Sequence, residues 1–153
     1  MIFFGMETFL QLILATFLGG LLGLEREYNR KEAGLRTFAL VALGAAFFTI
    51  IAYDSVKIFF EEPPVGFDPS RIIGQIVLGI GFLGAGLIVY RELRIEGLTT
   101  AAGLWVAAAI GAAVGAKLYF PAIFATILTL FVLIGLIWIE DKFIKKRLEK
   151  SKK

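Results

Sequence analysis

The amino-acid sequence predicts an all-α fold, a polytopic membrane bundle of five transmembrane helices, and three observations support this prediction. Hydrophobic residues make up 58% of the 153 residues and charged residues only 19%, and the mean hydropathy is +0.82. Apolar runs long enough to cross a bilayer core of roughly 30 Å, which takes about 20 residues per helix, recur along the chain. The fifteen phenylalanines suit lipid-facing surfaces, because a soluble domain of this size would expose them in large apolar patches.

Five apolar runs define the expected helices in chain order. They cover residues 6–24, 35–53, 72–90, 99–116 and 118–139. The separation of the last two depends on Lys117 and on Pro121, which is tolerated near a helix start because its missing N–H would be unpaired there. If these two runs formed one re-entrant unit, the bundle would have four spans. We expect residues 1–140 to form the transmembrane domain and residues 141–153 a basic cytoplasmic tail.

Capping sequences mark the starts of the third and fourth helices. In DPSR, Asp68 can accept backbone N–H groups of the first turn, and Pro69 has the backbone angle that a first helical position requires. In GLTT, Gly97 permits a turn, and Thr99 or Thr100 is expected to cap the fourth helix. A polar path lined by the two threonine hydroxyls is the alternative interpretation.

The distribution of lysine and arginine predicts the orientation of the bundle. Thirteen of these residues lie in the links after the first and third helices and in the tail, whereas Lys57, Arg71 and Lys117 lie on the opposite side. The positive-inside rule therefore places the N-terminus outside and the tail in the cytoplasm. The tail is expected to anchor to anionic headgroups, with partner binding as the alternative. The first run has neither a basic leader nor an A-x-A site, so we expect it to be retained.

Small residues recur at helical spacing in three of the runs and predict close helix contacts. They form ladders in the first helix (Ala15, Gly19, Gly23) and in the fourth (Gly103, Ala107, Gly111, Gly115), and the third helix contains Gly74, Gly79, Gly81, Gly84 and Gly86. Such residues let helix backbones approach closely in a bilayer. We therefore expect the first, third and fourth helices to form the tight inner unit, with the third at its centre and the bulky fifth helix peripheral. The glycines of the third helix form either a sealed packing seam or an unwound segment that lines a path.

The link after the first helix is crowded with charges. Its sequence LEREYNRKEAGLRT contains Glu25, Arg26, Glu27, Arg30, Lys31 and Arg36. One interpretation is a polar cluster that gates or recruits something at the cytoplasmic mouth. The other is an interfacial network of ion pairs four residues apart, together with positive-inside charges. Glu25 directly follows an apolar run, where a carboxylate needs a partner, and Arg36 is the partner we expect.

The residue content argues against an enzyme. The chain has neither cysteine nor histidine, which removes thiolate chemistry and the commonest zinc ligand. Its serines lie outside the apolar runs, and we expect no cofactor and no nucleic-acid partner. Acidic residues on the predicted outer side, Asp54, Glu61, Glu62 and Asp68, are candidates for a divalent-cation site, although their spacing matches no defined loop. Arg71 is the expected partner of Asp68 or of another helix.

Four ordered motifs resemble the membrane domain of the MgtC/SapB family: ERE-x3-K-x2-GLRT, DPSR, GIGFLGAG and GLTTAA-x2-W. The resemblance covers about residues 19–115. It implies a five-helix protein of the bacterial or archaeal plasma (inner) membrane, linked to magnesium limitation and to survival in host phagocytes. Virulence-linked members also have a cytoplasmic ACT-like domain, and we expect a short form without it here.

The resemblance also implies a set of functional positions. The residues that match the shared motifs are Glu25, Arg26, Glu27, Lys31, Gly34, Arg36, Thr37, Asp68, Arg71, Gly84, Gly86, Thr99 and Thr100. We add three glycines from the third helix and the link that follows it, namely Gly79, Gly81 and Gly97.

Two functions are compatible with these observations. The first is a small regulator or scaffold that uses its small-residue ladders to bind other membrane proteins in magnesium homeostasis or stress adaptation. The resemblance implies partners such as an F-type ATP synthase or magnesium-uptake proteins. The alternative is a transporter or channel for a cation such as Mg²⁺, formed by a homo-oligomer around the glycine-rich third helix. Five helices are few for a transporter, so self-association is expected.

Overall fold

A computed structural model describes residues 5–59, 68, 70–91 and 94–136. The five predicted helices are all present: α1 (Met6–Tyr28), α2 (Leu35–Phe59), α3 (Ser70–Leu87), α4 (Leu98–Gly115) and α5 (Tyr119–Leu130). A π-helical turn, η1 (Phe131–Gly135), continues α5. By length and composition α1, residues 35–54 of α2, α3 and α4 can each cross a membrane, and the apolar segment Tyr119–Gly135 is shorter. The predicted tail at 141–153 lies outside the described residues, and the orientation of the bundle stays a prediction.

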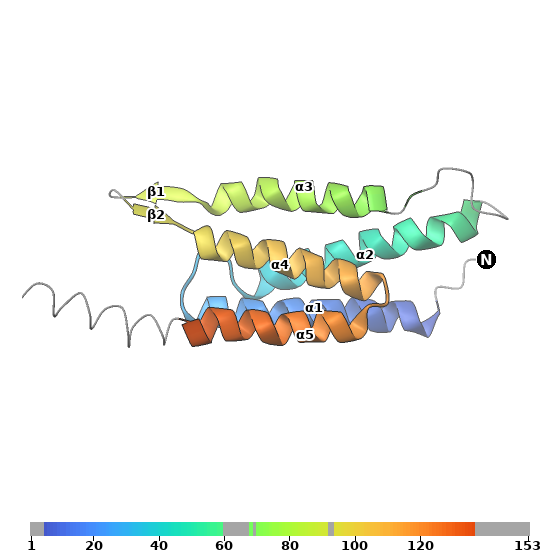
Figure 1. The fold of residues 1–153 in the computed structure, drawn as a ribbon, viewed down its shortest axis with the longest axis horizontal. Coiled ribbons are helices and arrows are strands. Elements are labelled where there is room, and N and C mark those ends of the chain that lie inside the picture. Colours follow the sequence, from blue (N-terminus) through green and yellow to red (C-terminus); the bar gives the residue numbers. More distant parts are fainter. Residues whose placement is uncertain (1–4, 60–67, 69, 92–93, 137–153) are drawn as a thin grey trace, which may run out of the picture.

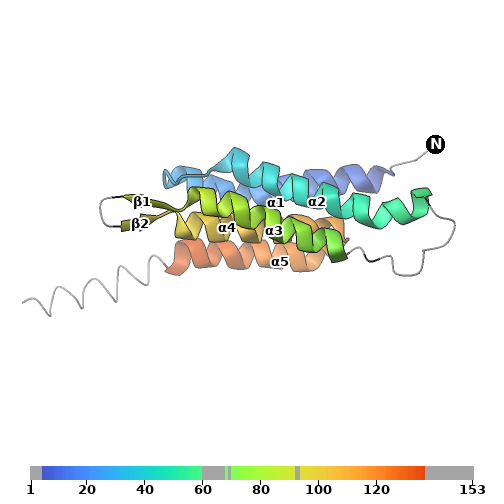
Figure 2. The same cartoon turned by 90° about the horizontal axis from the view of Figure 1, so that it is seen from above.

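The helices run side by side along one long axis (Figures 1 and 2). In Figure 1, α4 lies between α3 on one side and α1 on the other. The buried core contains residues from α1, α2 and α4, including Leu22, Phe38, Leu104 and Val114. This arrangement makes α4 the most enclosed helix, with 61% of its residues buried.

Both small-residue ladders pack against α2. A Cβ added to Gly19 of α1 would lie 2.7 Å from the Phe38 carbonyl oxygen of α2. A Cβ added to Gly115 of α4 would lie 2.6 Å from the carbonyl oxygen of Ala46, again in α2. Such contacts leave no room for a side chain, so at these glycines α1 and α4 pack directly against the α2 backbone. The inner unit is therefore α1, α2 and α4, and not the first, third and fourth helices as predicted.

The prediction that the third helix forms the centre of the bundle is wrong. Only 11% of the α3 residues are buried, and a Cβ added at Gly74, Gly79, Gly81 or Gly86 would meet no atom within 4 Å. Gly84 alone among the five packs, at 3.6 Å from the Ala101 Cβ of α4. The helix is continuous from Ser70 to Leu87, so the unwound alternative is also wrong. Ile80 and Gly84 are the buried residues of α3, so the other four glycines lie at the bundle surface.

The connections at the two ends of α4 differ from each other. A tight turn with Lys117 at φ 64° separates α4 from α5, which confirms that the last two runs are separate helices. Between α3 and α4 the chain forms a short antiparallel hairpin of β1 (Val89–Arg91) and β2 (Arg94–Glu96), which the sequence analysis had treated as a link. Gly97 follows at φ 85°, a conformation that glycine adopts without strain, so the predicted turn is confirmed.

Candidate functional site

A pocket lined by both polar and apolar side chains lies at the end of the bundle where α1 and α5 finish and α4 begins. Its volume is about 550 Å³. The polar side is formed by Arg26, Lys31, Glu32, Thr99 and Thr100, and the apolar side includes Leu98, Val132, Leu133 and Leu136. We call it the end pocket. It brings together five of the residues that the sequence singled out, namely Arg26, Lys31, Gly97, Thr99 and Thr100.

Arg26 is the most enclosed charged residue of the end pocket, with 1% of its surface exposed. Its Nε and Nη2 atoms donate to the carboxylate of Glu25, the second contact being 2.6 Å long. The Nδ2 of Asn29 donates to the same carboxylate at 2.7 Å. Glu25 therefore has a partner, as expected of a carboxylate at the end of an apolar run. The partner is Arg26 rather than the predicted Arg36, because α1 continues to Tyr28 and turns Arg26 into the bundle while Arg36 lies exposed on α2.

Glu27 connects the end of α1 to the start of α2. Its Oε2 atom accepts the backbone N–H of Leu35 at 2.7 Å, which satisfies one of the free donors at the α2 N-terminus. A carboxylate is also favoured there by the helix dipole. Gly34 lies against this side chain, since a Cβ there would come 3.1 Å from the Glu27 Cβ. The motif residues Glu27 and Gly34 thus act together in shaping the tight link between the two helices.

Thr100 ties the same link to α4. Its hydroxyl, buried in the bundle, donates to Glu32 Oε2 at 2.7 Å. The N-cap residue of α4 is Gly97, and no side chain makes a capping hydrogen bond there. The prediction that Thr99 or Thr100 caps this helix is therefore wrong. Both threonines lie inside α4, which begins at Leu98, and the Thr100 hydroxyl donates instead to Glu32, 68 residues away in sequence. The hydrogen bond from Thr100 holds the pKa of Glu32 below its ordinary value of 4.5.

Replacing Thr100 by valine should make stability less dependent on pH. Because the folded-state pKa of Glu32 is depressed, its contribution is fully present above 4.5 and is lost as the pH falls through the folded-state pKa. The Thr100→Val variant should lose about 1 kcal/mol of unfolding free energy at neutral pH and less at acid pH. Denaturant unfolding in detergent, followed by circular dichroism as the pH is lowered, measures this. Thr99→Val, at an exposed position, is the control, and an equal loss in both variants would contradict the prediction.

The remaining motif residues lie outside the end pocket. Arg36 and Thr37 are exposed in the first turn of α2. Asp68 caps α3 as predicted, since its Oδ1 accepts the Ser70 N–H at 2.9 Å. The N–H of Arg71 donates to the Asp68 carbonyl oxygen at 3.2 Å. Gly79, Gly81 and Gly86 lie on the open surface of α3 described above.

The candidate cation site stays a prediction. Glu61 and Glu62 lie outside the described residues, and within the described ranges no group of three acidic residues lies close enough to hold a metal ion. Asp68 is committed to the α3 cap, and the hydrogen bond from Ser70 lowers its pKa.

Gln11, which is 3% exposed within the first apolar run, was not among the predicted functional residues. Its Nε2 donates to the carbonyl oxygens of Val114 and Gly115, at 2.9 and 3.1 Å, and so satisfies the last turn of α4. The signal was present, because an isolated polar side chain within a membrane helix usually faces the bundle interior and bonds there. At the same end of the bundle Lys117 and Tyr119 both donate to the carboxylate of Glu7.

Comparison with known proteins adds a family match. The sequence profile of the MgtC family matches residues 12–142. Over 127 residues the chain is 45% identical to YhiD of Escherichia coli (strain K12), which carries the provisional name of a magnesium transporter; the match covers 83% of this chain and 59% of YhiD. Over 121 residues it is 45% identical to the protein MgtC of Salmonella typhimurium (strain LT2), covering 79% of this chain and 48% of that protein.

The chain thus spans about half to three fifths of the length of these curated relatives. An uncharacterized protein of Synechocystis is 42% identical over 130 residues, which are 85% of this chain and 52% of that protein. No solved structure matches the chain.

Proposed function

Since this chain belongs to the MgtC family of membrane proteins, we propose that it is a small regulator or scaffold that acts on other membrane proteins. The process we propose is magnesium homeostasis or adaptation to stress. The magnesium link is supported by the provisional name of the E. coli relative and by the family resemblance. Other multi-pass proteins of the plasma membrane, such as an F-type ATP synthase or magnesium-uptake proteins, are the proposed partners.

The observation that carries this proposal is the contrast between the sealed inner unit and the open third helix. The ladders of α1 and α4 are in contact with the α2 backbone at Gly19, Gly111 and Gly115, so their small residues are already used within the bundle. The proposed binding face is therefore on α3 and not on the ladders. Phe82 and Leu78 on this helix are 82% and 72% exposed, and Gly74 and Gly81 have open space beside them.

These residues give α3 a surface suited to another helix. On a helix with 3.6 residues per turn, Gly74, Leu78, Gly81 and Ala85 follow one another on a single face. Small residues on such a face allow close helix approach in a bilayer, where packing replaces the hydrophobic effect. The fifth helix is also exposed, but α5 contains no glycine, and its outward side chains, among them Phe120 and Phe124, are bulky.

The cation-transporter alternative has weaker support. It is favoured by the name of the E. coli relative and by the exposed α3 glycines, which a second copy of the chain could cover in a homo-oligomer. However, α3 is continuous, so it offers no free backbone carbonyls of the kind that broken transporter helices use to coordinate ions. Within the described residues Glu32 of the end pocket accepts a hydrogen bond from Thr100, and the neighbouring Glu25 is paired with Arg26.

Crosslinking from single cysteines should separate α3 from α5, because the chain has no cysteine of its own. Phe82 and Phe131 form a matched pair of exposed side chains: Phe82 lies 12 residues after Ser70, where α3 begins, and Phe131 of η1 lies 12 residues after Tyr119, where α5 begins. In native membranes Phe82→Cys should yield a discrete adduct with another membrane protein, whereas Phe131→Cys should not. Mass spectrometry of the adduct identifies the partner.

Equal adducts from both positions, or none from Phe82→Cys, would contradict the proposal. The alternative is tested with the same purified protein in liposomes that contain a magnesium-sensitive dye. A flux above that of empty liposomes, reduced in Gly81→Leu, would favour the oligomeric transporter.

A further inference from the structure

The first turn of α4 brings backbone N–H groups to the end pocket that have no acceptor among the described residues. The first N–H of this helix to find a carbonyl is that of Ala101, which donates to the Gly97 oxygen at 2.8 Å. The N–H groups of Leu98, Thr99 and Thr100 precede it, and no described side chain accepts them. Thr100 is only 2% exposed, so its N–H is shielded from bulk water. An unpaired, buried N–H is costly, and an acceptor within the pocket would therefore be stabilising.

The guanidinium of Arg26 independently offers a donor to the same pocket. Its Nε and Nη2 atoms donate to Glu25, whereas Nη1 donates to no described residue. In the described part of the chain every side-chain nitrogen or oxygen that is sealed from solvent has a partner. Nη1 must therefore open onto the pocket that Arg26 lines, although the residue as a whole is 1% exposed. A guanidinium nitrogen with free N–H groups is suited to an oxyanion such as a carboxylate or a phosphate.

The charges around the end pocket favour an anion with a single charge. Arg26 is paired with Glu25, and the opposite charges of Lys31 and Glu32 offset each other. Glu32 accepts the Thr100 hydroxyl but none of the free N–H groups of α4. What remains uncompensated is the helix N-terminus, which carries about half a positive elementary charge. A singly charged oxyanion matches this remainder, whereas a dianion would be repelled more strongly by Glu32.

The opposite wall of the end pocket is apolar and requires more than a bare ion. It includes Val132 and Leu133 of η1, and Leu136 directly after it. Single π-helical turns are rare and occur frequently at functional sites. The pocket volume of about 550 Å³ lies within the range of small-molecule sites, roughly 300–1,000 Å³. The space and its lining therefore suit a ligand that joins an oxyanion to an apolar part.

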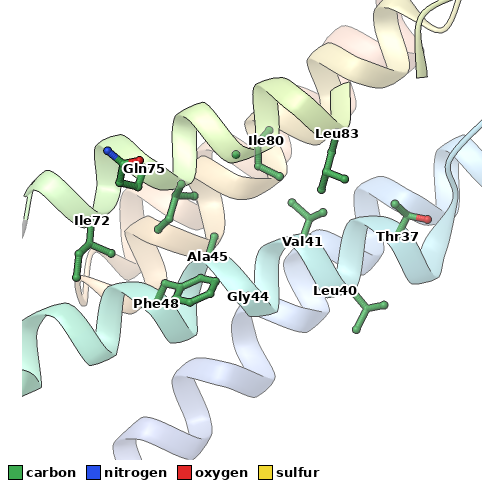
Figure 3. A pocket seen from close by; sticks show the side chains of 12 residues that line it. Thr37, Leu40, Val41, Gly44, Ala45, Phe48, Ile72, Gln75, Ile80 and Leu83 are labelled. Atoms are coloured by element: carbon green, nitrogen blue, oxygen red, sulfur yellow. The ribbon is translucent and has the colours of Figure 1, made fainter. Parts of the chain in front are cut away.

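The larger groove between α2 and α3 lacks these donors (Figure 3). Its volume is about 650 Å³, and its lining is apolar except for Thr37 and Gln75. The N-termini of α2 and α3 already have carboxylate acceptors, Glu27 on the Leu35 N–H and Asp68 on the Ser70 N–H. The free donors thus belong to the end pocket, and the groove provides a control for nonspecific apolar binding.

We infer that the end pocket binds an amphiphile with a singly charged oxyanion head. The head lies on the Arg26 Nη1 atom and the free N–H groups of α4, and the apolar part lies against the η1 wall. In a membrane the carboxylate of a fatty acid and the phosphate diester of a phospholipid share this chemistry. The site is separate from the outward face of α3, so it does not rest on the proposed regulatory function.

Native mass spectrometry of the purified protein tests the ligand class with two matched pairs of compounds. Oleate is compared with oleyl alcohol, and phosphatidylglycerol with diacylglycerol, so that each anion has an uncharged counterpart with the same apolar part. At least one anion should be retained about fivefold over its counterpart, which is the effect of a charge at a helix N-terminus. The pair that shows the preference identifies the head as a carboxylate or a phosphate diester. Equal retention within both pairs would overturn the inference.

The variant Thr99→Asp tests the position of the head. It places a carboxylate at an exposed position in the first turn of α4, where the helix dipole favours it, so the fold should keep its stability. The new carboxylate competes for the free N–H groups and repels the ligand, so retention of the anion should fall about fivefold. Thr99→Asn is the matched control, with the same shape but no charge, and should bind like the wild type. Gly79→Leu narrows the groove of Figure 3 and should also leave retention unchanged.

Retention that is unchanged in Thr99→Asp, or equally reduced in Thr99→Asn, would overturn the inference. A loss in Gly79→Leu alone would place the ligand in the groove between α2 and α3 and would overturn it as well. Thermal unfolding in detergent verifies that each variant is folded before its retention is compared. None of these outcomes depends on the Phe82→Cys adduct.

Discussion

Replacing Gly111 by alanine should destabilise the protein by about 3 kcal/mol, at the upper end of what overpacking a tight core costs. The added Cβ would overlap the Ala42 carbonyl oxygen and would lie 2.8 Å from both the Ala42 carbonyl carbon and its Cα. These atoms belong to the backbone of α2, so they cannot move aside as the end of a flexible side chain can. Relief requires α2 and α4 to separate, which also loosens the contact of α1 with α2. Thermal or denaturant unfolding in detergent measures the loss.

The matched control is Gly81→Ala on α3. A Cβ there meets no atom within 4 Å, and alanine is the better helix former, so this variant should be as stable as the wild type or slightly more stable. Equal stability of both variants would show that α4 does not lie against α2 as described. The same contrast explains why a variant of the α4 ladder is unsuitable for testing partner binding, because it disrupts the bundle itself.

Replacing Arg26 by methionine should be the second severe change, with a loss of about 3–5 kcal/mol, the range for breaking one partner of a buried ion pair. The side chains of Arg26 and Glu25 are 2% and 7% exposed, so the variant leaves the Glu25 carboxylate with little access to water. Asn29 donates a single hydrogen bond to it, which does not compensate a full charge. Unfolding free energy in detergent is again the measurement, together with the yield of monodisperse protein.

The double variant Glu25→Gln with Arg26→Met distinguishes the ion pair from the packing of the arginine. If the unpaired charge causes the loss, removing it should restore most of the stability, because a buried pair replaced as a whole is often neutral. A double variant as unstable as Arg26→Met would instead show that the arginine stem fills space that methionine does not. In that case the end pocket depends on the shape of Arg26 more than on its charge.

Local signals in the sequence predicted those features that depend on near neighbours. The five helices follow from apolar runs, since each span satisfies its own backbone hydrogen bonds. The Asp68 cap was predictable because donor and acceptor are two residues apart. Gly97 was likewise identifiable, as a positive φ is a property of one residue. The motif residues Glu25 and Arg26 were identified as candidates, but their mutual pairing was not.

Features that depend on residues far apart in the chain could not be predicted from the sequence. The role of Thr100 depends on Glu32, 68 residues away in sequence. The role of Gln11 depends on the last turn of α4, more than 100 residues away. The glycines give the clearest case. Gly111 and Gly81 are alike in sequence, yet one is pressed against α2 and the other is open.

Local composition and backbone angles set the helical membrane bundle, the positions of its spans and the turn at Gly97, so these features can be predicted from the sequence. Which small residues become contacts depends on how the helices pack. A glycine permits close approach but does not choose its neighbour, and both ladders pair with α2 because its backbone at Ala42 and Ala46 lies within reach of each. The third helix therefore keeps open glycines, and these form the surface proposed for a membrane-protein partner.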